Sequence, residues 1–223
     1  PPPPPAAPPQ PGAPDGTWQT KPSAITYNSV HGGEIYNANL ETPLWATTRD
    51  NSEGWQNVKT IEGPKAEMSA HTAPTDRIVE TMKPISLARR EDGAWIVDFG
   101  KEISGWIHFR DLKGTKGDTL KVDYLSESVQ GNMRYVMNGS GNEEYAPRFT
   151  WFAFSKAVIT GIDQLTTKNL TADVVNTDVA RAADFHTTDT LFNRINEIWQ
   201  RSQLDNMHGG IASDCPHREG RRR

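Results

Sequence analysis

The stretch of sequence that decides the fold lies between residues 94 and 110. It reads AWIVDF at 94–99 and, five residues later, GWIHFR at 105–110. Both runs are rich in aromatic and β-branched residues, a composition that favours pleated, half-buried strands. Runs of the same kind recur at 119–124 (TLKVDY) and 149–154 (FTWFAF). Turn-forming residues separate the runs, at EDG (91–93), KGTKGD (113–118) and NGSGN (138–142). Strands of about six residues at this spacing predict an antiparallel, jelly-roll-like β-sandwich.

Beyond the strand-like region the hydrophobic period changes. Five large apolar residues follow at helical spacing: Leu191, Phe192, Ile195, Ile198 and Trp199. With one of residues 187–189 as the N-cap, this pattern predicts a helix over 189–203 and then a loop over 205–210. A single amphipathic helix cannot bury its own apolar face, so we expect this face to cause aggregation or to pair with another chain.

These patterns divide the mostly β chain into four parts. Residues 1–16 form a proline-rich leader that has too few apolar side chains for a core and is expected to be disordered. Residues 17–70 are the remnant of one β-sandwich module, and residues 75–180 form a second one. Residues 184–223 begin a helical domain, because the long β region gives way there to a lone helix.

Composition excludes several classes of function. The chain has 24 Lys and Arg against 28 Asp and Glu, a net charge of −4, so no broad basic surface for nucleic acid is expected. Its single cysteine, Cys215, excludes an internal disulfide and a multi-cysteine metal site. No apolar run reaches the ~20 residues of a membrane helix, and no signal-peptide pattern indicates a location. Seven tryptophans are many for 223 residues. Burial in the core is the first expectation for each of them, and stacking of an exposed ring on a sugar is the alternative.

Reactive side chains are densest in DCPHRE, at 214–219. Cys215, His217 and a carboxylate could ligate a metal, although a structural zinc site needs four ligands. A nucleophilic Cys215–His217 pair and a loop of solvated charges are two further interpretations. The fourth is glycoside hydrolysis, which needs a protonated acid and a second carboxylate. Asp214 and Glu219 can face one pocket, where Arg218 keeps one of them ionised and an apolar wall raises the pKa of the other.

An ordered set of motifs precedes this hexapeptide. They are GEIYNANLE (33–41), Trp55, ETMKP (80–84), WIVDFG (95–100) with GW (105–106), PRFT (147–150) with Phe154, and Phe185 and Asp189 with LFNRI (191–195). Together with DCPHRE, they resemble the bacterial α-L-rhamnosidases of glycoside hydrolase family 78. The resemblance covers about residues 17 to 219.

The resemblance implies a fold and a reaction. The 75–180 module would be concanavalin-like, and 184–223 would open an (α/α)6 catalytic barrel. The reaction would be inverting hydrolysis of terminal α-L-rhamnosyl bonds in a glycan or glycoside, with no cofactor. Glu219 matches the family's general acid, Asp214 an acidic residue that contacts the sugar, and Arg218 an arginine beside these carboxylates. The family leads us to expect a periplasmic or extracellular protein.

The chain also departs from the family pattern. After Glu219 it reads GRRR, where the family continues with Leu-Gly-Trp and a second acidic residue. Since the family's general base lies in that continuation, we expect a truncated fragment that is inactive alone. The competing expectation is a carbohydrate-binding or domain-packing sandwich without catalysis. Four acids are candidate Ca²⁺ ligands, with solvated surface acids as the alternative: Glu34, Glu41, Asp50 and Glu53.

Overall fold

One long strand, β7 (Trp95–Leu112), contains most of the 94–110 stretch in the computed structural model. Alternate side chains, such as Val97 and Phe99 or Ile107 and Phe109, are buried, as the two-residue period of a strand requires. Its antiparallel partners are β6 (Ser86–Arg89), β10 (Glu143–Tyr145), β11 (Phe152–Thr160) and β12 (Leu170–Thr177).

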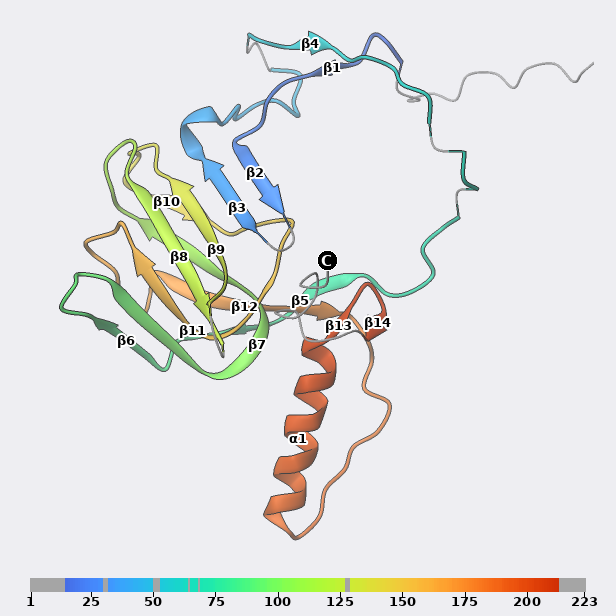
Figure 1. The fold of residues 1–223 in the computed structure, drawn as a ribbon, viewed down its shortest axis with the longest axis vertical. Coiled ribbons are helices and arrows are strands. Elements are labelled where there is room, and N and C mark those ends of the chain that lie inside the picture. The colour runs from blue at the N-terminus through green and yellow to red at the C-terminus, as the bar shows by residue number, and fades with distance from the viewer. Residues whose placement is uncertain are drawn as a thin grey trace, which may run out of the picture. The chain divides into compact units, whose positions relative to one another are not determined.

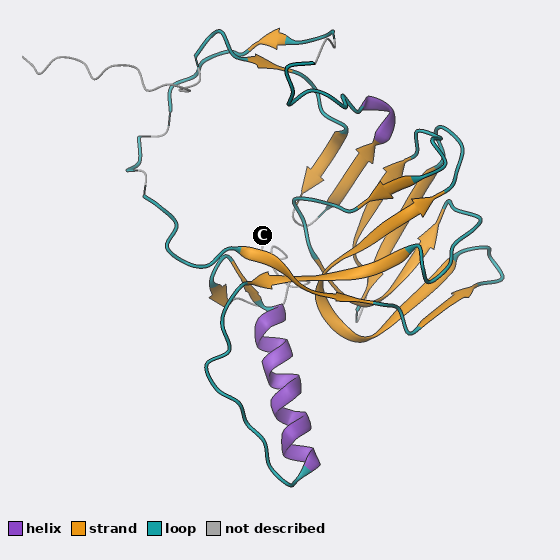
Figure 2. Ribbon diagram, turned by 180° about the vertical axis from the view of Figure 1, so that it is seen from behind, coloured by secondary structure: helices purple, strands orange, loops and turns teal. Residues whose placement is uncertain are grey.

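A bulge bends β7 near its middle. Lys156 of β11 pairs with Asp98 and Phe154 pairs with Ile103, so residues 99–102 of β7 stand opposite a single residue of β11. Gly100 in the bulge has a φ of 80°, a left-handed conformation that glycine adopts without strain. Figure 1 shows β7 curving so that the sheet curls over on itself, and Figure 2 shows the same curl from behind. The predicted β-sandwich architecture is confirmed.

β7 belongs to a ten-stranded sheet. Its main path runs β2-β3-β9-β8-β11-β7-β12-β5, with β6 and β10 paired to β7 beside that path. The other strands are β2 (Ile25–Ser29), β3 (Gly33–Asn37), β5 (Asp76–Met82), β8 (Thr119–Leu125) and β9 (Val129–Val136). The pairs along the path are antiparallel except β3 with β9, which is parallel. A 3-10 turn, η1 (Ala38–Leu40), follows β3.

The structure describes residues 15–29, 32–49, 53–63, 65–67, 69–126 and 129–212. It divides into two compact units, one made of Pro1–Ser23 with Thr42–Ala70 and the other of Ala24–Glu41 with His71–Arg223. This division differs from the predicted parts 17–70 and 75–180, because β3 pairs with β9 and so belongs to the large sheet.

The first unit contains a short two-stranded sheet. β1 (Gln19–Thr20) pairs antiparallel with β4 (Gln56–Asn57). The ammonium of Lys21 lies 5.9 Å from the centre of the Trp55 ring, a cation–π contact. Residues 1–14 of the predicted leader lie outside the described residues.

The core of the sandwich consists of phenylalanine, tyrosine and aliphatic side chains. Tyr124 stacks on Phe152 with ring centres 4.0 Å apart and meets Phe154 edge-on. The expectation that the tryptophans are buried was wrong: all seven lie in the described part of the chain, and none is fully buried. Of the two in β7, Trp95 shares the face of the buried Val97 and Phe99, and Trp106 alternates with the buried Ile107 and Phe109. Both are only partly buried, and they pack against the core. The closed interior therefore holds the smaller rings.

The described chain ends in a helix and a hairpin. α1 (Thr190–Asp205) is capped by Asp189, whose side chain accepts a hydrogen bond from Leu191 N–H at 2.8 Å, so the predicted helix is confirmed. No residue of α1 is buried, and the five apolar side chains of the predicted helical pattern are 52–63% exposed. Among the described residues, no helix is long and apolar enough to cross a membrane.

Candidate functional site

The predicted site residues Asp214, Arg218 and Glu219 lie outside the described residues, as do Cys215 and His217. The described chain reaches Ala212, so the element nearest to them is the hairpin of β13 (Met207–His208) and β14 (Ile211–Ala212). The contacts of this hairpin define the part of the candidate site that the structure describes.

The hairpin replaces the loop that was predicted over 205–210, and that prediction was wrong. α1 extends to Asp205, and His208 then pairs with Ile211 across a two-residue turn. Gly209 and Gly210 form this turn with φ values of 63° and 80°. Two successive glycines adopt this left-handed geometry readily, and it matches the twist of a tight hairpin.

A hydrogen-bonded series centred on His208 joins the hairpin to the sheet. Nε2 of His208 lies 2.8 Å from Oγ of Ser104 in β7, and Nδ1 lies 2.9 Å from Oδ2 of Asp76 in β5. Trp151 stacks on the imidazole, with ring centres 4.2 Å apart and planes 20° from parallel. The side chain of His208 is 9% exposed and Ser104 is fully buried. The imidazole is therefore held on both nitrogens and on one face.

The turn of the hairpin adds backbone contacts to the same carboxylate. Gly209 N–H donates to Oδ1 of Asp76 at 2.8 Å, and Gly210 N–H donates to Oγ1 of Thr177 at 2.9 Å. The Thr177 hydroxyl in turn donates to Oδ1 of Asp76 at 3.0 Å. Burial by itself raises the pKa of Asp76, but the hydrogen bonds from Gly209, His208 and Thr177 outweigh it, so the pKa lies below its usual range. Asp76 is therefore an ionised acceptor at neutral pH.

Asp205, the last residue of α1, forms a second link to β7. Its Oδ1 accepts the backbone N–H of Ser104 at 3.1 Å. Burial raises the pKa of Asp205 to about 6, although the Ser104 hydrogen bond and the charge of Arg201 oppose the rise. Asp205 can therefore exchange a proton close to neutral pH, a property that functional carboxyl groups share.

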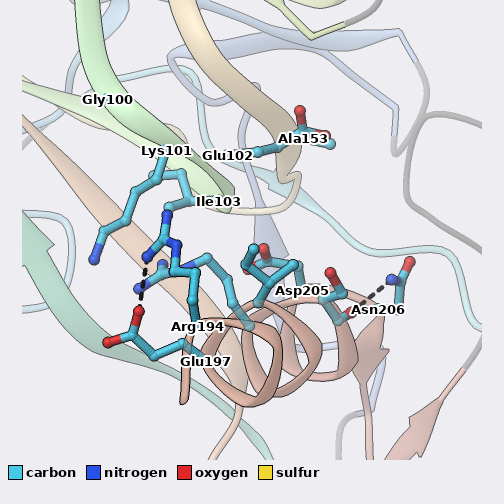
Figure 3. A pocket seen from close by; sticks show the side chains of 12 residues that line it. Gly100, Lys101, Glu102, Ile103, Ala153, Arg194, Glu197, Asp205 and Asn206 are labelled. Carbon is cyan, nitrogen blue, oxygen red and sulfur yellow. Dashed lines mark hydrogen bonds and ion pairs between the residues drawn. The ribbon is translucent and has the colours of Figure 1, made fainter. Parts of the chain in front are cut away.

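A hollow of about 580 Å³ lies between α1 and the β7 bulge (Figure 3). Its charged lining residues are Lys101, Glu102, Arg194, Glu197, Arg201 and Asp205. Nη1 of Arg194 lies 2.7 Å from the Glu197 carboxylate, and Lys101 and Arg201 are both within 4 Å of Glu80 in β5. Such carboxylates and guanidinium groups can hydrogen-bond the hydroxyl groups of a carbohydrate.

The order Ser104, His208, Asp76 is that of a serine hydrolase triad, in which a histidine takes the proton of a serine and a carboxylate holds the histidine. A nucleophilic serine must also reach a substrate carbonyl. Ser104 has no exposed surface, so no substrate atom can approach its Oγ. The series therefore serves to hold the hairpin on the sheet.

Two of the four candidate Ca²⁺ ligands, Glu34 and Glu41, accept hydrogen bonds from other side chains or the backbone of the protein. Glu34 is buried and accepts hydrogen bonds from the Tyr145 hydroxyl and the Arg148 N–H, while Glu41 accepts one from the Tyr36 hydroxyl. Glu53 belongs to the other compact unit, and Asp50 lies outside the described residues. Within the described ranges, no three His, Cys, Asp or Glu side chains form a group that could hold a metal ion.

Sequence reasoning did not find Asp76, Ser104 or His208. His208 is 104 residues from Ser104 and 132 residues from Asp76, so no local motif contains two of them. The one local signal was the Gly209-Gly210 pair, which predicts a tight hairpin when strand-like residues flank it.

Two family models match the chain. The α-L-rhamnosidase N-terminal domain matches residues 13–80, and the bacterial α-L-rhamnosidase concanavalin-like domain matches residues 88–176. An α-L-rhamnosidase of Formosa agariphila is 29% identical over 224 residues, which cover 92% of this chain and 23% of that protein. An α-L-rhamnosidase of Streptomyces avermitilis is 22% identical over 219 residues, which cover 92% of this chain and 21% of that protein. The chain thus spans about a quarter of the length of the curated relatives it matches.

Solved structures agree with these matches. The α-L-rhamnosidase from Dictyoglumus thermophilum has a TM-score of 0.84 at 29% identity, covering 91% of this chain and 24% of that one. The native enzyme from Aspergillus terreus has a TM-score of 0.83 at 25% identity, covering 91% of this chain and 25% of that one. The expected resemblance is confirmed: the chain belongs to the bacterial α-L-rhamnosidase family and carries its β-rich N-terminal and concanavalin-like domains.

Proposed function

We propose that this protein takes part in hydrolysing terminal α-L-rhamnosyl bonds of glycans or glycosides, with inversion at the sugar carbon. The observation that carries this proposal is the order of features along one chain. Two rhamnosidase domains, at 13–80 and 88–176, are followed by α1 and then by DCPHRE at 214–219. In this proposal, residues 184–223 begin a helical catalytic domain of the (α/α)6 type.

Three residues of the hexapeptide have a proposed role. Glu219 protonates the glycosidic oxygen as the bond to the leaving group breaks, because an alkoxide is too poor a leaving group at neutral pH. Asp214 orients the sugar or the attacking water through its carboxylate. Arg218 binds beside the carboxylates and favours the ionised form of Asp214, while Glu219 keeps its proton.

The proposal also covers the behaviour of the 223-residue chain by itself. Inverting hydrolysis needs a second carboxylate roughly 6.5–9.5 Å from the acid, with room between them for a water molecule. Asp214 is only five residues before Glu219, and the relatives are about four times as long as this chain. We therefore expect this chain to bind a rhamnoside without turning it over.

Two measurements on the purified chain test the proposal. Release of chromophore from an aryl α-L-rhamnoside measures turnover, and titration calorimetry with the same compound measures binding. We expect binding without turnover, and binding weakened in Glu219→Gln. The matched control is Glu91→Gln, which makes the same change in an exposed turn away from the hollow and is expected to bind normally. Equal affinity in both variants would remove Glu219 from the site.

A second candidate function is carbohydrate binding by the sandwich itself, without the hexapeptide. The charged hollow between α1 and β7 is the observation that favours it. In that case Arg194→Gln, in the wall of the hollow, should weaken rhamnoside binding and Glu219→Gln should not. The two functions therefore give opposite results with the same ligand.

A further inference from the structure

Three strands of the sheet converge on the β13–β14 hairpin. Asp76 comes from β5, Ser104 from β7 and Thr177 from β12, and each hydrogen-bonds either the His208 side chain or the glycine turn. Asp205 adds a bond from the end of α1 to the backbone of Ser104. Hydrogen bonds between groups withdrawn from water are lost at a high free-energy cost, so the hairpin has one strongly preferred place on the sheet.

The proton positions in the series follow from the acceptor at one end. An ionised carboxylate can only accept, so Nδ1 of His208 carries the proton that Asp76 binds. In the neutral imidazole Nε2 is then an acceptor, and the Ser104 hydroxyl donates to it at 2.8 Å. Asp76 therefore fixes the tautomer of His208, and stacking on Trp151 fixes the plane of its ring.

The hexapeptide with the proposed catalytic residues follows the hairpin closely in the sequence. Asp214 is six residues after His208, and six extended residues span at most about 20 Å. A carboxylate on so short a tether keeps its position only if the start of the tether is fixed. The described residues that fix it are those of the His208 series.

We propose that His208 is a positioning residue for the 214–219 segment: through Asp76 and Ser104 it fixes the hairpin from which that segment runs. This role rests on the proposed function of Asp214 and Glu219. Loss of the imidazole leaves the ionised Asp76 and the buried Ser104 hydroxyl without their partner, so the hairpin detaches while the rest of the sheet stays paired.

Amide hydrogen exchange on the 223-residue chain, followed by mass spectrometry, measures this anchoring directly. In His208→Ala we expect exchange in peptides covering 205–219 to accelerate about tenfold or more, as the loss of a charge-assisted hydrogen bond implies. Peptides from β8 and β11 should exchange as before. Unchanged exchange over 205–219 would overturn the proposal.

His108 provides the matched control. Like His208 it is held on both ring nitrogens, here by two carboxylates, with Nε2 2.7 Å from Glu144 and Nδ1 3.1 Å from Asp173. His108→Ala should leave exchange over 205–219 unchanged. His208→Asn keeps an N–H donor for Asp76 and should restore part of the protection. Equal acceleration in the two alanine variants would show a general loss of stability and overturn the proposal.

The tautomer gives a readout that a purely space-filling role would not change. In Asp76→Asn the amide can donate to Nδ1, which moves the imidazole proton to Nε2. Nitrogen chemical shifts of His208 at about pH 9, where an ordinary imidazole is neutral, should report Nδ1–H in the parent and Nε2–H in the variant. The same Nε2–H tautomer in both chains would overturn the proposed direction of the series.

Titration with an aryl α-L-rhamnoside separates this proposal from the proposed function. We expect binding to weaken about tenfold in His208→Ala and to stay unchanged in His108→Ala. Faster exchange without weaker binding would overturn the positioning role. Absence of binding in the parent chain would overturn the proposed function, while the exchange data would still decide whether His208 anchors the hairpin.

Discussion

The phenol oxygen of Tyr145 lies 2.9 Å from Oε1 of Glu34, a residue 111 positions earlier in the chain. Both side chains are buried, and Glu34 is 1% exposed. The other carboxylate oxygen accepts the Arg148 N–H at 3.2 Å and the Asn28 side-chain amide at 3.3 Å. A buried carboxylate is tolerated only when such donors surround it. Glu34 therefore ties the β2–β3 hairpin to β10 and to the segment that follows it.

Removing the hydroxyl in Tyr145→Phe should destabilise the protein. The change leaves Oε1 of Glu34 buried without this donor, which we expect to cost about 1–3 kcal/mol in the free energy of unfolding. Urea denaturation followed by tryptophan fluorescence measures it. The control is Tyr27→Phe, which removes a hydroxyl from a side chain in the same hairpin that is 47% exposed, and it should cost less than about 0.5 kcal/mol. Equal losses in the two variants would contradict the role of Glu34.

Asp205→Asn should stabilise the protein at neutral pH. The folded-state pKa of about 6 is above the ordinary value near 4, so folding favours the neutral acid. The stability that the neutral acid contributes is lost as the pH rises through 6. The amide stays neutral and still offers an oxygen to Ser104 N–H. We expect the variant to gain about 1–3 kcal/mol over the parent between pH 4 and pH 7. A pH-independent difference in urea denaturation would contradict this assignment.

Asp76 should show the opposite pH dependence. Burial raises its folded-state pKa, but hydrogen bonds from Gly209, His208 and Thr177 outweigh burial and lower it. The ionised Asp76 therefore contributes to folding stability above the ordinary pKa of an aspartate. The contribution is lost as the pH falls through the lowered folded-state value. Asp76→Ala should therefore be less stable than the parent at pH 7, and the difference should shrink in acid. A difference that grows on acidification would count against an ionised Asp76.

The apolar face of α1 should promote self-association. Ile195 and Trp199 are 52% and 63% exposed on one side of the helix, and exposed apolar patches of this kind mark contact surfaces. We expect Ile195→Gln combined with Trp199→Gln to shift the sedimentation profile toward monomer. Ile61→Gln, at a side chain that is 83% exposed in the other compact unit, is the control and should leave it unchanged. A parent chain that is monomeric at every concentration would refute the expectation.

Local patterns predicted the local structure well. The run at 94–99 and its neighbours alternate in burial as expected, and α1 begins at the predicted cap. Hydrophobic period and capping depend on a few adjacent residues, which is why the sequence alone reveals them. The hairpin at 207–212 was missed because its strands have only two residues each and so have no period to detect.

Long-range pairing could not be predicted in the same way. Nothing in GEIYN indicates a parallel pairing with β9, and it is this pairing that places residues 24–41 with the large sheet. The His208 series likewise combines residues from three distant strands and a turn. The reactive residues of the hexapeptide, in contrast, were found through a family motif, and their roles stay predictions.

The parallel pairing of β3 with β9 also sets an order of events during synthesis. Glu34 and its partner in the pairing, Met133, are about a hundred residues apart, so β3 leaves the ribosome long before β9 exists. A loop of that length must close before the pairing contributes any stability, and folds rich in such contacts form slowly. Strand β3, although it is made well before β9, is thus among the last to find its place in the sheet.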